Sequence, residues 1–165
     1  MIVLPLIRTQ RLTLEPLRIA TVDALFEAEW RVEQGKAPAL RRSDHEVRER
    51  LLRWAGLGNV AQPTGTWMID VEGKIVGRAG MDRPDDRGPV YLSYALAPNM
   101  RGQGLATEAA SALLDWILDR SDGIDIHAVA RPTNHASLAV MKRLGMAKHP
   151  DSDADNIVFY VRRPS

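Results

Sequence analysis

The segment Arg101-Gly102-Gln103-Gly104-Leu105-Ala106 decides the fold of this chain, because it joins two different patterns. The apolar run from Tyr91 to Ala97 predicts a strand before it, and an amphipathic helical pattern follows it. A strand that breaks at two glycines and restarts as a helix leaves backbone N–H groups unpaired at the positive end of the helix dipole. Glycine also lets phosphate oxygens approach the main chain closely. The segment predicts a phosphate-bearing cofactor, although strand, turn and helix also make an ordinary βα connection.

The length of the chain, 165 residues, fits one domain spanning residues 1–165. A domain of that size buries roughly 70% of its unfolded surface. Lysine and arginine number 22 against 21 aspartates and glutamates, so the charge balance argues against a nucleic-acid partner. The sequence contains no cysteine, which excludes disulfides, thiolate metal sites and cysteine nucleophiles and is typical of a cytoplasmic protein.

The hydrophobic segments are too short for a secretion signal or a membrane span. The opening run from Met1 to Ile7 is followed at once by Arg8, unlike a signal peptide. No stretch reaches the roughly 18 consecutive apolar residues of a spanning helix. We therefore expect a soluble cytoplasmic protein with no membrane partner.

Periodicity predicts strands and helices that alternate along the chain. The expected strands cover residues 11–17, 66–71, 74–81, 91–97, 124–130 and 156–161, with a hairpin turn at Glu72-Gly73. The expected helices begin at Thr21, at a capping box of Ser43 and Glu46, at Leu105 and at Asn134, and Gly145 ends the last of them. Elements that alternate around one mixed sheet make an α/β or α+β domain.

Two further segments lie at a distinctive distance from the glycine turn. Asn134-His135-Ala136-Ser137 is followed by Met141-Lys142-Arg143-Leu144-Gly145-Met146, and Pro98 stands three residues before Arg101. With them the chain resembles, over nearly its full length, the GCN5-related N-acetyltransferase (GNAT) superfamily. The pattern of that superfamily, Arg/Gln-x-x-Gly-x-Gly/Ala, is met by Arg101, Gly104 and Ala106. Residues 7–14 are similar to the start of the ribosomal-protein N-terminal acetyltransferases, the RimJ and RimL branch.

The resemblance implies the GNAT fold, a central mixed and mostly antiparallel sheet flanked by helices, and acetyl-CoA as the donor. It places the diphosphate on the main-chain amides of Arg101, Gly102, Gln103, Gly104, Leu105 and Ala106, extending to Thr107. It also implies a splayed strand whose residues Ala95, Leu96 and Ala97 offer backbone groups to the pantetheine arm and the thioester carbonyl, where an N–H stabilises the oxyanion. Asn134 is expected to reach the pantetheine, and it is equally a candidate helix cap.

The chemistry of acetyl transfer needs a free amine, an oriented thioester and a proton for the departing thiolate. Many relatives carry a glutamate on the strand before the turn, but Tyr91-Leu92-Ser93-Tyr94 has no carboxylate. An α-amino acceptor, with a pKa of about 7.7 to 8.0 against about 10.4 for lysine, needs less help, and water is then a sufficient base. Ser137 is the first candidate for a hydroxyl near the leaving sulfur and Tyr94 the second; their structural alternatives are helix packing and core packing.

Other polar residues have ordinary explanations. The histidines His45, His127, His135 and His149 show no helical pairing, and without cysteine no metal site is expected. Three aspartates precede the strand before the turn and act either as surface residues or as an attraction for a cationic amine: Asp82, Asp85 and Asp86.

The sequence thus predicts an enzyme that moves an acetyl group from acetyl-CoA to a primary amine by direct attack. The leading acceptor is a protein N-terminus, and the alternatives are an aminoglycoside, a polyamine or an amino acid. A homodimer is compatible with the resemblance. Two rival functions stay open: an NAD-binding oxidoreductase, because Gly102, Gly104 and Thr107 echo the dinucleotide fingerprint, and a non-catalytic acetyl-CoA-binding module, because the strand lacks the carboxylate.

Overall fold

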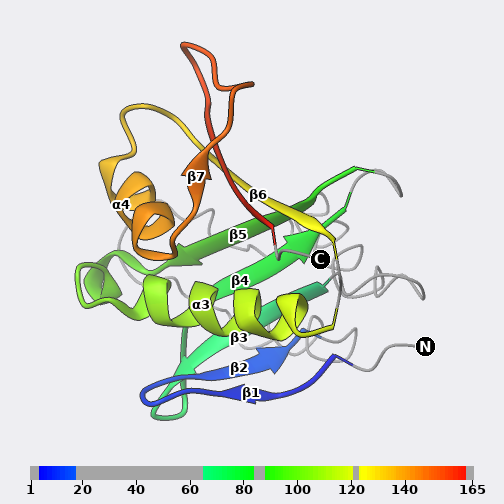
Figure 1. Cartoon of the computed structure of the whole chain (residues 1–165). Coiled ribbons are helices and arrows are strands. Elements are labelled where there is room, and N and C mark those ends of the chain that lie inside the picture. Colours follow the sequence, from blue (N-terminus) through cyan, green and yellow to red (C-terminus); the bar gives the residue numbers. More distant parts are fainter. Residues whose placement is uncertain (1–3, 18–64, 84–87, 121–122, 163–165) are drawn as a thin grey trace, which may run out of the picture.

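The computed structural model describes residues 4–17, 65–83, 88–120 and 123–162 (Figure 1). The helices expected from Thr21 and from Ser43 lie outside the described residues, as do His45, Asp85 and Asp86.

An eight-stranded sheet runs through the described part of the chain in the order β1-β2-β3-β4-β5-β6-β8-β7. Every neighbouring pair in it is antiparallel except β5 and β6, which are parallel. The sheet is therefore mixed and mostly antiparallel, as expected. Its strands are β1 (Ile7–Arg8), β2 (Thr13–Pro16), β3 (Gly65–Val71), β4 (Lys74–Asp82), β5 (Val90–Leu96), β6 (Asp125–Ala130), β7 (Ala147–Lys148) and β8 (Ile157–Arg162).

The hairpin between β3 and β4 turns at Glu72 and Gly73, as the sequence predicts. Both residues have positive φ, 52° and 80°, which is the backbone of the tight turn that matches the twist of paired strands. The Asp70 carboxylate accepts the Gly73 N–H at 2.9 Å and closes the turn. Next to the turn, the pairing of β3 with β4 shifts register between Ile69 and Asp70, so that Val76 on β4 has no paired residue on β3.

The helix α3 (Leu105–Leu118) covers one face of the sheet (Figure 1). The predicted apolar stripe is confirmed at Leu105, Ala109, Leu113, Trp116 and Ile117, which are all buried, whereas Ala112 is only half-buried. The indole of Trp116 packs edge-on against that of Trp67 on β3, with ring centroids 5.4 Å apart. This packing fixes the axis of α3, and with it the direction in which its N-terminus points.

The helix α4 (His135–Arg143) is defined by the caps that the sequence predicts at both ends. Asn134 is its N-cap, and the Asn134 Oδ1 accepts the Ser137 N–H at 3.1 Å. At the other end Gly145 has φ of 73°. The Gly145 N–H donates to Lys142 and the Met146 N–H to Met141, the paired bonds of a Schellman motif. The helix therefore presents a fixed first turn to the strands below it.

The strands β5 and β6 pair at only two positions and then diverge. Val90 is opposite Ile126 and Tyr91 is opposite His127, and β5 has no partner in β6 beyond them. The strand β6 continues along β8, and β5 continues along β4. Figure 1 shows β5 and β6 separating toward the side where α4 lies. This separation leaves a gap in the middle of the sheet.

None of the helices in the described ranges has the length and apolar character needed to cross a membrane.

Candidate functional site

A run of free backbone N–H groups lies at the start of α3. The N–H groups from Gly102 to Thr107 make no hydrogen bond of normal geometry to any described residue, and the first one used within the helix is that of Glu108, which donates to Gly104 at 3.0 Å. Gly102 and Gly104 have φ of 74° and 78°, which glycine adopts without strain. The Arg101 N–H donates to Pro98 at 3.3 Å, so the available run begins one residue later than the sequence predicts.

The Thr107 hydroxyl supplies an independent sign of a ligand at this place. Its Oγ1 is buried and has no hydrogen-bond partner among the described residues. A buried hydroxyl without a partner costs about 1–3 kcal/mol. A phosphate group, with several acceptor oxygens, fits both the free N–H groups and this hydroxyl.

A clamp of three side chains holds the same turn, and sequence reasoning missed it. The Glu108 carboxylate accepts the Thr9 hydroxyl at 2.6 Å, the Arg11 N–H at 2.9 Å and the Arg11 Nε at 2.7 Å. The Arg11 Nη1 also donates to the Gln103 carbonyl at 2.8 Å. The connection between β1 and β2 is thereby tied to the turn that carries the free N–H groups. The one available signal was an acidic residue in the first turn of a helix, where the helix dipole favours it.

The clamp keeps Glu108 ionised. Burial raises the pKa of this carboxyl, but the hydrogen bonds from Thr9 and Arg11 together with the Arg11 charge outweigh burial and hold the pKa below its usual value. Arg11 in turn offsets the negative charge that Glu108 would otherwise place beside an anion. The Arg11 Nη2 has no partner among the described residues and lies 3.4 Å from where a Cβ on Gly104 would stand.

The direction of the backbone groups on β5 follows from one hydrogen bond. The Ala97 N–H donates to Val76 at 2.8 Å, and successive residues of a strand direct these groups to opposite sides. Ala97 and Ala95 therefore bond toward β4, and Leu96 and Tyr94 direct their N–H and C=O groups into the gap. Of the three strand residues expected to line the gap with backbone groups, only Leu96 does so. Its carbonyl accepts the Arg101 Nε at 3.1 Å.

The two predicted hydroxyl residues meet across the gap. The Tyr94 hydroxyl on β5 donates to the Ser137 carbonyl on α4 at 3.3 Å. Burial raises the pKa of Tyr94, and a hydrogen bond with Ser137 offsets part of that rise. Tyr94 is protonated at neutral pH, as an ordinary tyrosine is, and its hydroxyl is a hydrogen-bond donor.

Asn134 performs the capping role that was one of its two expected roles. Its Oδ1 is occupied by the Ser137 N–H, which ties the position of Ser137 to that of Asn134. The Asn134 amide nitrogen makes no hydrogen bond to a described residue, so it is free to contact a ligand in the gap.

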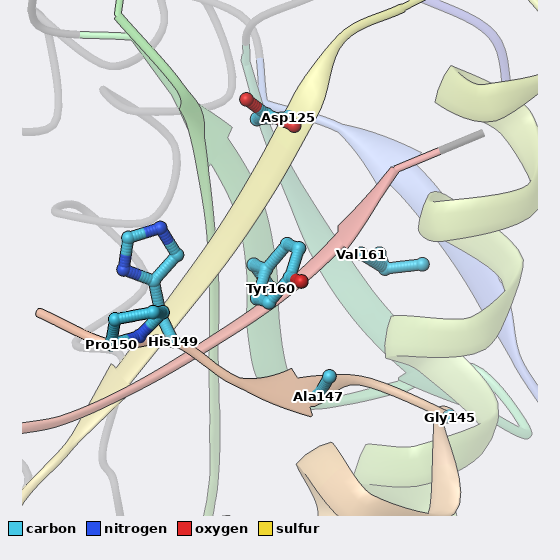
Figure 2. A pocket seen from close by; sticks show the side chains of 7 residues that line it. All are labelled: Asp125, Gly145, Ala147, His149, Pro150, Tyr160 and Val161. Carbon is cyan, nitrogen blue, oxygen red and sulfur yellow. The ribbon is translucent and has the colours of Figure 1, made fainter. Parts of the chain in front are cut away.

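Histidines and acidic residues form no metal cluster within the part of the chain that the structure describes. A pocket lies instead on the far side of β6 from the gap (Figure 2). It is lined by residues of β6, β7 and β8, among them Asp125 and Tyr160, and by residues next to β7, among them His149. It contains none of the residues of the glycine turn, so it is separate from the anion site.

Comparisons with known proteins agree with this geometry. Residues 11–147 match the family model described as "Acetyltransferase (GNAT) domain". A solved structure from Bordetella pertussis, assigned to the GnaT family of acetyltransferases, is 28% identical, with 96% of this chain and 99% of that chain covered and a TM-score of 0.74.

Two solved structures of lower identity share the fold. The ribosomal L7/L12 alpha-N-protein acetyltransferase RimL in complex with coenzyme A is 18% identical, with 96% and 97% of the two chains covered and a TM-score of 0.74. The ribosomal-protein-S5-alanine acetyltransferase from Vibrio fischeri is 16% identical, with 96% of each chain covered and a TM-score of 0.70.

The clamp makes stability depend on pH in a defined direction. Because the pKa of Glu108 is lowered in the fold, its contribution is complete above the unfolded-state pKa, about 4.3, and is lost as pH falls through the folded-state pKa. Urea unfolding should show that Glu108→Gln lowers the free energy of unfolding at pH 7, and that its difference from the unmodified chain shrinks at pH 3. Asp115→Asn, at an exposed position of α3, serves as the control and should change little. Equal losses for Glu108→Gln at both pH values would contradict the clamp.

Proposed function

Because the chain belongs to the GNAT family of acetyltransferases, we propose that it transfers the acetyl group of acetyl-CoA to a primary amine, with a protein N-terminus as the leading acceptor. The observation that carries the proposal is the run of free N–H groups from Gly102 to Thr107 at the mouth of the gap between β5 and β6.

The turn before α3 binds the diphosphate in this proposal. Its free N–H groups point toward one anion at the N-terminus of a helix, where the dipole adds to the attraction. The buried Thr107 hydroxyl and the Arg11 Nη2 supply further donors beside them. Both glycines matter, because a Cβ at either would force an L-residue into positive φ.

The gap receives the pantetheine arm. Leu96 and Tyr94 direct backbone groups into it, because successive residues of β5 alternate in direction and Ala97 bonds toward β4. The amides of the arm pair with such groups as a strand would. Bound acetyl-CoA supplies the activated thioester. A strand N–H that reaches the thioester carbonyl stabilises the oxyanion that forms as the amine attacks.

Ser137 and Tyr94 are the proposed proton donors for the departing thiolate. They approach one another from α4 and β5 across the gap, and Tyr94 is held in its protonated form by burial. A positioned acid of this kind contributes about 10²–10⁴-fold to a rate.

A protein N-terminus is favoured as acceptor for two reasons. An α-amino group, with a pKa of about 7.7 to 8.0, is partly free at neutral pH, which suits a β5 strand that carries no glutamate. Structural neighbours of this chain also include enzymes named for ribosomal-protein N-termini. Aminoglycosides, polyamines and amino acids stay as alternatives that the same assay distinguishes.

Calorimetry on matched glycine variants tests the anion site. Gly104 and Gly73 have nearly equal φ, 78° and 80°, so Gly104→Ala and Gly73→Ala should lose similar stability, about 1–2 kcal/mol. Only Gly104→Ala should weaken acetyl-CoA binding, by about tenfold or 1.4 kcal/mol. The unmodified chain should bind acetyl-CoA and not NAD. Binding of NAD alone would support an oxidoreductase and overturn the proposal.

Steady-state kinetics test the two hydroxyls. Ser137→Ala should lower kcat by about tenfold to a hundredfold, within the range of lost acid catalysis, without changing the Kd for acetyl-CoA. Tyr94→Phe should have a smaller effect in the same direction. Ser111→Ala, half-buried on α3, is the control for removing a hydroxyl elsewhere. A Ser137→Ala variant with normal kcat would assign Ser137 to packing alone.

An acceptor screen tests the substrate. Release of the CoA thiol should be faster with peptides that have a free N-terminus than with the same peptides acetylated at the N-terminus and carrying an internal lysine. Spermidine, kanamycin and free alanine represent the alternative classes of acceptor. Binding of acetyl-CoA without thiol release from any amine would indicate a non-catalytic binding module.

A further inference from the structure

Three aromatic rings surround His127 and form with it a cluster of four. The centroid of the His127 ring lies 4.9 Å from that of His149, 5.9 Å from that of Tyr91 and 6.2 Å from that of Tyr160. The rings of His149 and Tyr160 are 5.2 Å apart. We call these residues the ring cluster. Figure 2 shows His149 and Tyr160, two of its members, at the edge of the pocket.

The ring cluster lies on the face of the sheet opposite α3. On β6, the neighbours of His127 are Ile126 and Ala128, both buried in the core. Since side chains alternate along a strand, His127 points away from that core. Tyr91 does the same between Val90 and Leu92, and Tyr160 is paired with His127 on the adjacent strand.

His127 also marks the closed end of the gap. Tyr91 and His127 are the last paired residues before β5 and β6 diverge. The pantetheine arm has about twelve covalent bonds between its phosphate oxygen and its sulfur, so it extends at most about 14 Å, like four extended residues. Measured along β5 from Leu96, that length ends near Leu92, next to Tyr91. The thioester is therefore delivered to the end of the gap that His127 borders.

The two faces of the gap have different access. On the α3 face, Tyr94 and Ser137 approach one another across the gap. On the opposite face, Ser93 and Ala95 of β5 are exposed. An acceptor amine that reaches the thioester from the face where Ser93 and Ala95 are exposed passes His127.

From this placement, and resting on the proposed acetyltransferase function, we propose that His127 takes the proton from the acceptor amine. It thereby supplies the base that Tyr91-Leu92-Ser93-Tyr94 lacks. The contact is direct or through one water.

The charges around His127 suit this role. Burial lowers the pKa of His127, the neighbouring His149 lowers it further, and Asp125 and Asp151 offset part of the change. The imidazole is therefore neutral at pH 7 and able to accept a proton. Asp82 on β4 pairs with Tyr91 on β5 and is exposed at the same end of the gap. Together with the carboxylates of Asp125 and Asp151 it attracts a cationic amine.

Protons balance across the two faces. The acceptor enters as an ammonium, and its nitrogen loses two protons in all, the first before attack, to free its lone pair, and the second as the carbon–nitrogen bond forms and the carbon–sulfur bond breaks. One passes to His127 and then to water. The other replaces the proton that the hydroxyl of Ser137 or Tyr94 gives to the thiolate, so the products are an amide, a thiol and one released proton.

The pH dependence of kcat tests the proposal. At saturating acceptor, kcat of the unmodified enzyme should rise with pH as His127 loses its proton, and then reach a plateau. The midpoint of this rise, which we call the limb, should lie below about 6.5, the ordinary pKa of histidine. In His127→Gln, which cannot titrate, the limb should move to the pKa of the amine, about 7.7 to 8.0. At pH 6.5, kcat of His127→Gln should be about a hundredfold below that of the unmodified enzyme. Above pH 9, where the amine is already free, the difference should shrink to within about tenfold.

A matched variant in the same cluster separates chemistry from packing. His149→Gln removes a ring that contacts His127 and Tyr160 but lies farther from the gap. It should keep the plateau of kcat and move the limb to higher pH, because His149 lowers the pKa of His127. An unchanged limb in His127→Gln, or equal losses of kcat in both variants, would overturn the inference. Failure of the unmodified chain to acetylate any amine while it binds acetyl-CoA would overturn the proposed function instead.

Discussion

The divergence of β5 from β6 is the constraint on which the rest of this structure depends. A sheet normally pairs every internal backbone group, and here β5 loses one partner after Tyr91 while it keeps the other along β4. Beyond that point the groups of Tyr94 that face the gap have no strand partner, and they need a substitute that hydrogen-bonds as a strand does. In the proposed function an amide-bearing arm enters the gap and meets that need, so the proposal explains the opening in the sheet and the unpaired groups together.

The free N–H groups at the mouth of the gap raise a related problem of stability. A turn that leaves its donors unpaired has few hydrogen bonds of its own to hold its shape. The clamp of Thr9, Arg11 and Glu108 supplies them from residues far away in the sequence. The N–H groups of the turn thus keep their direction although they make no hydrogen bond to a described residue. Such preorganisation lowers the cost of ordering the site when the ligand binds.

The sequence predicts the parts of this site that local patterns encode and misses those set by register. The glycine turn, the stripe of α3 and both caps of α4 have local signals, and all are found. The clamp joins Thr9 and Arg11 to Glu108, which lies far away in the sequence, so no local periodic pattern connects these residues. The groups of β5 that face the gap depend on which residue of β4 bonds to Ala97, and that pairing is set by the register between two strands rather than by either strand alone. Propensity and periodicity carry no information about such a choice.

The side chains of β5 alternate between the two faces of the sheet, and in the proposed mechanism this alternation places different chemical groups on each face. Even-numbered residues of β5 turn toward α3 and α4, where Tyr94 meets Ser137, and odd-numbered residues turn toward the ring cluster through Tyr91. A proton donor for the sulfur and a proton acceptor for the amine must act on opposite sides of one carbonyl carbon. A single strand at the edge of a gap places one group on each side, because its side chains alternate. The proposed base, His127, lies on the neighbouring strand at the point where the two strands part, so the proposal requires no carboxylate on β5 itself.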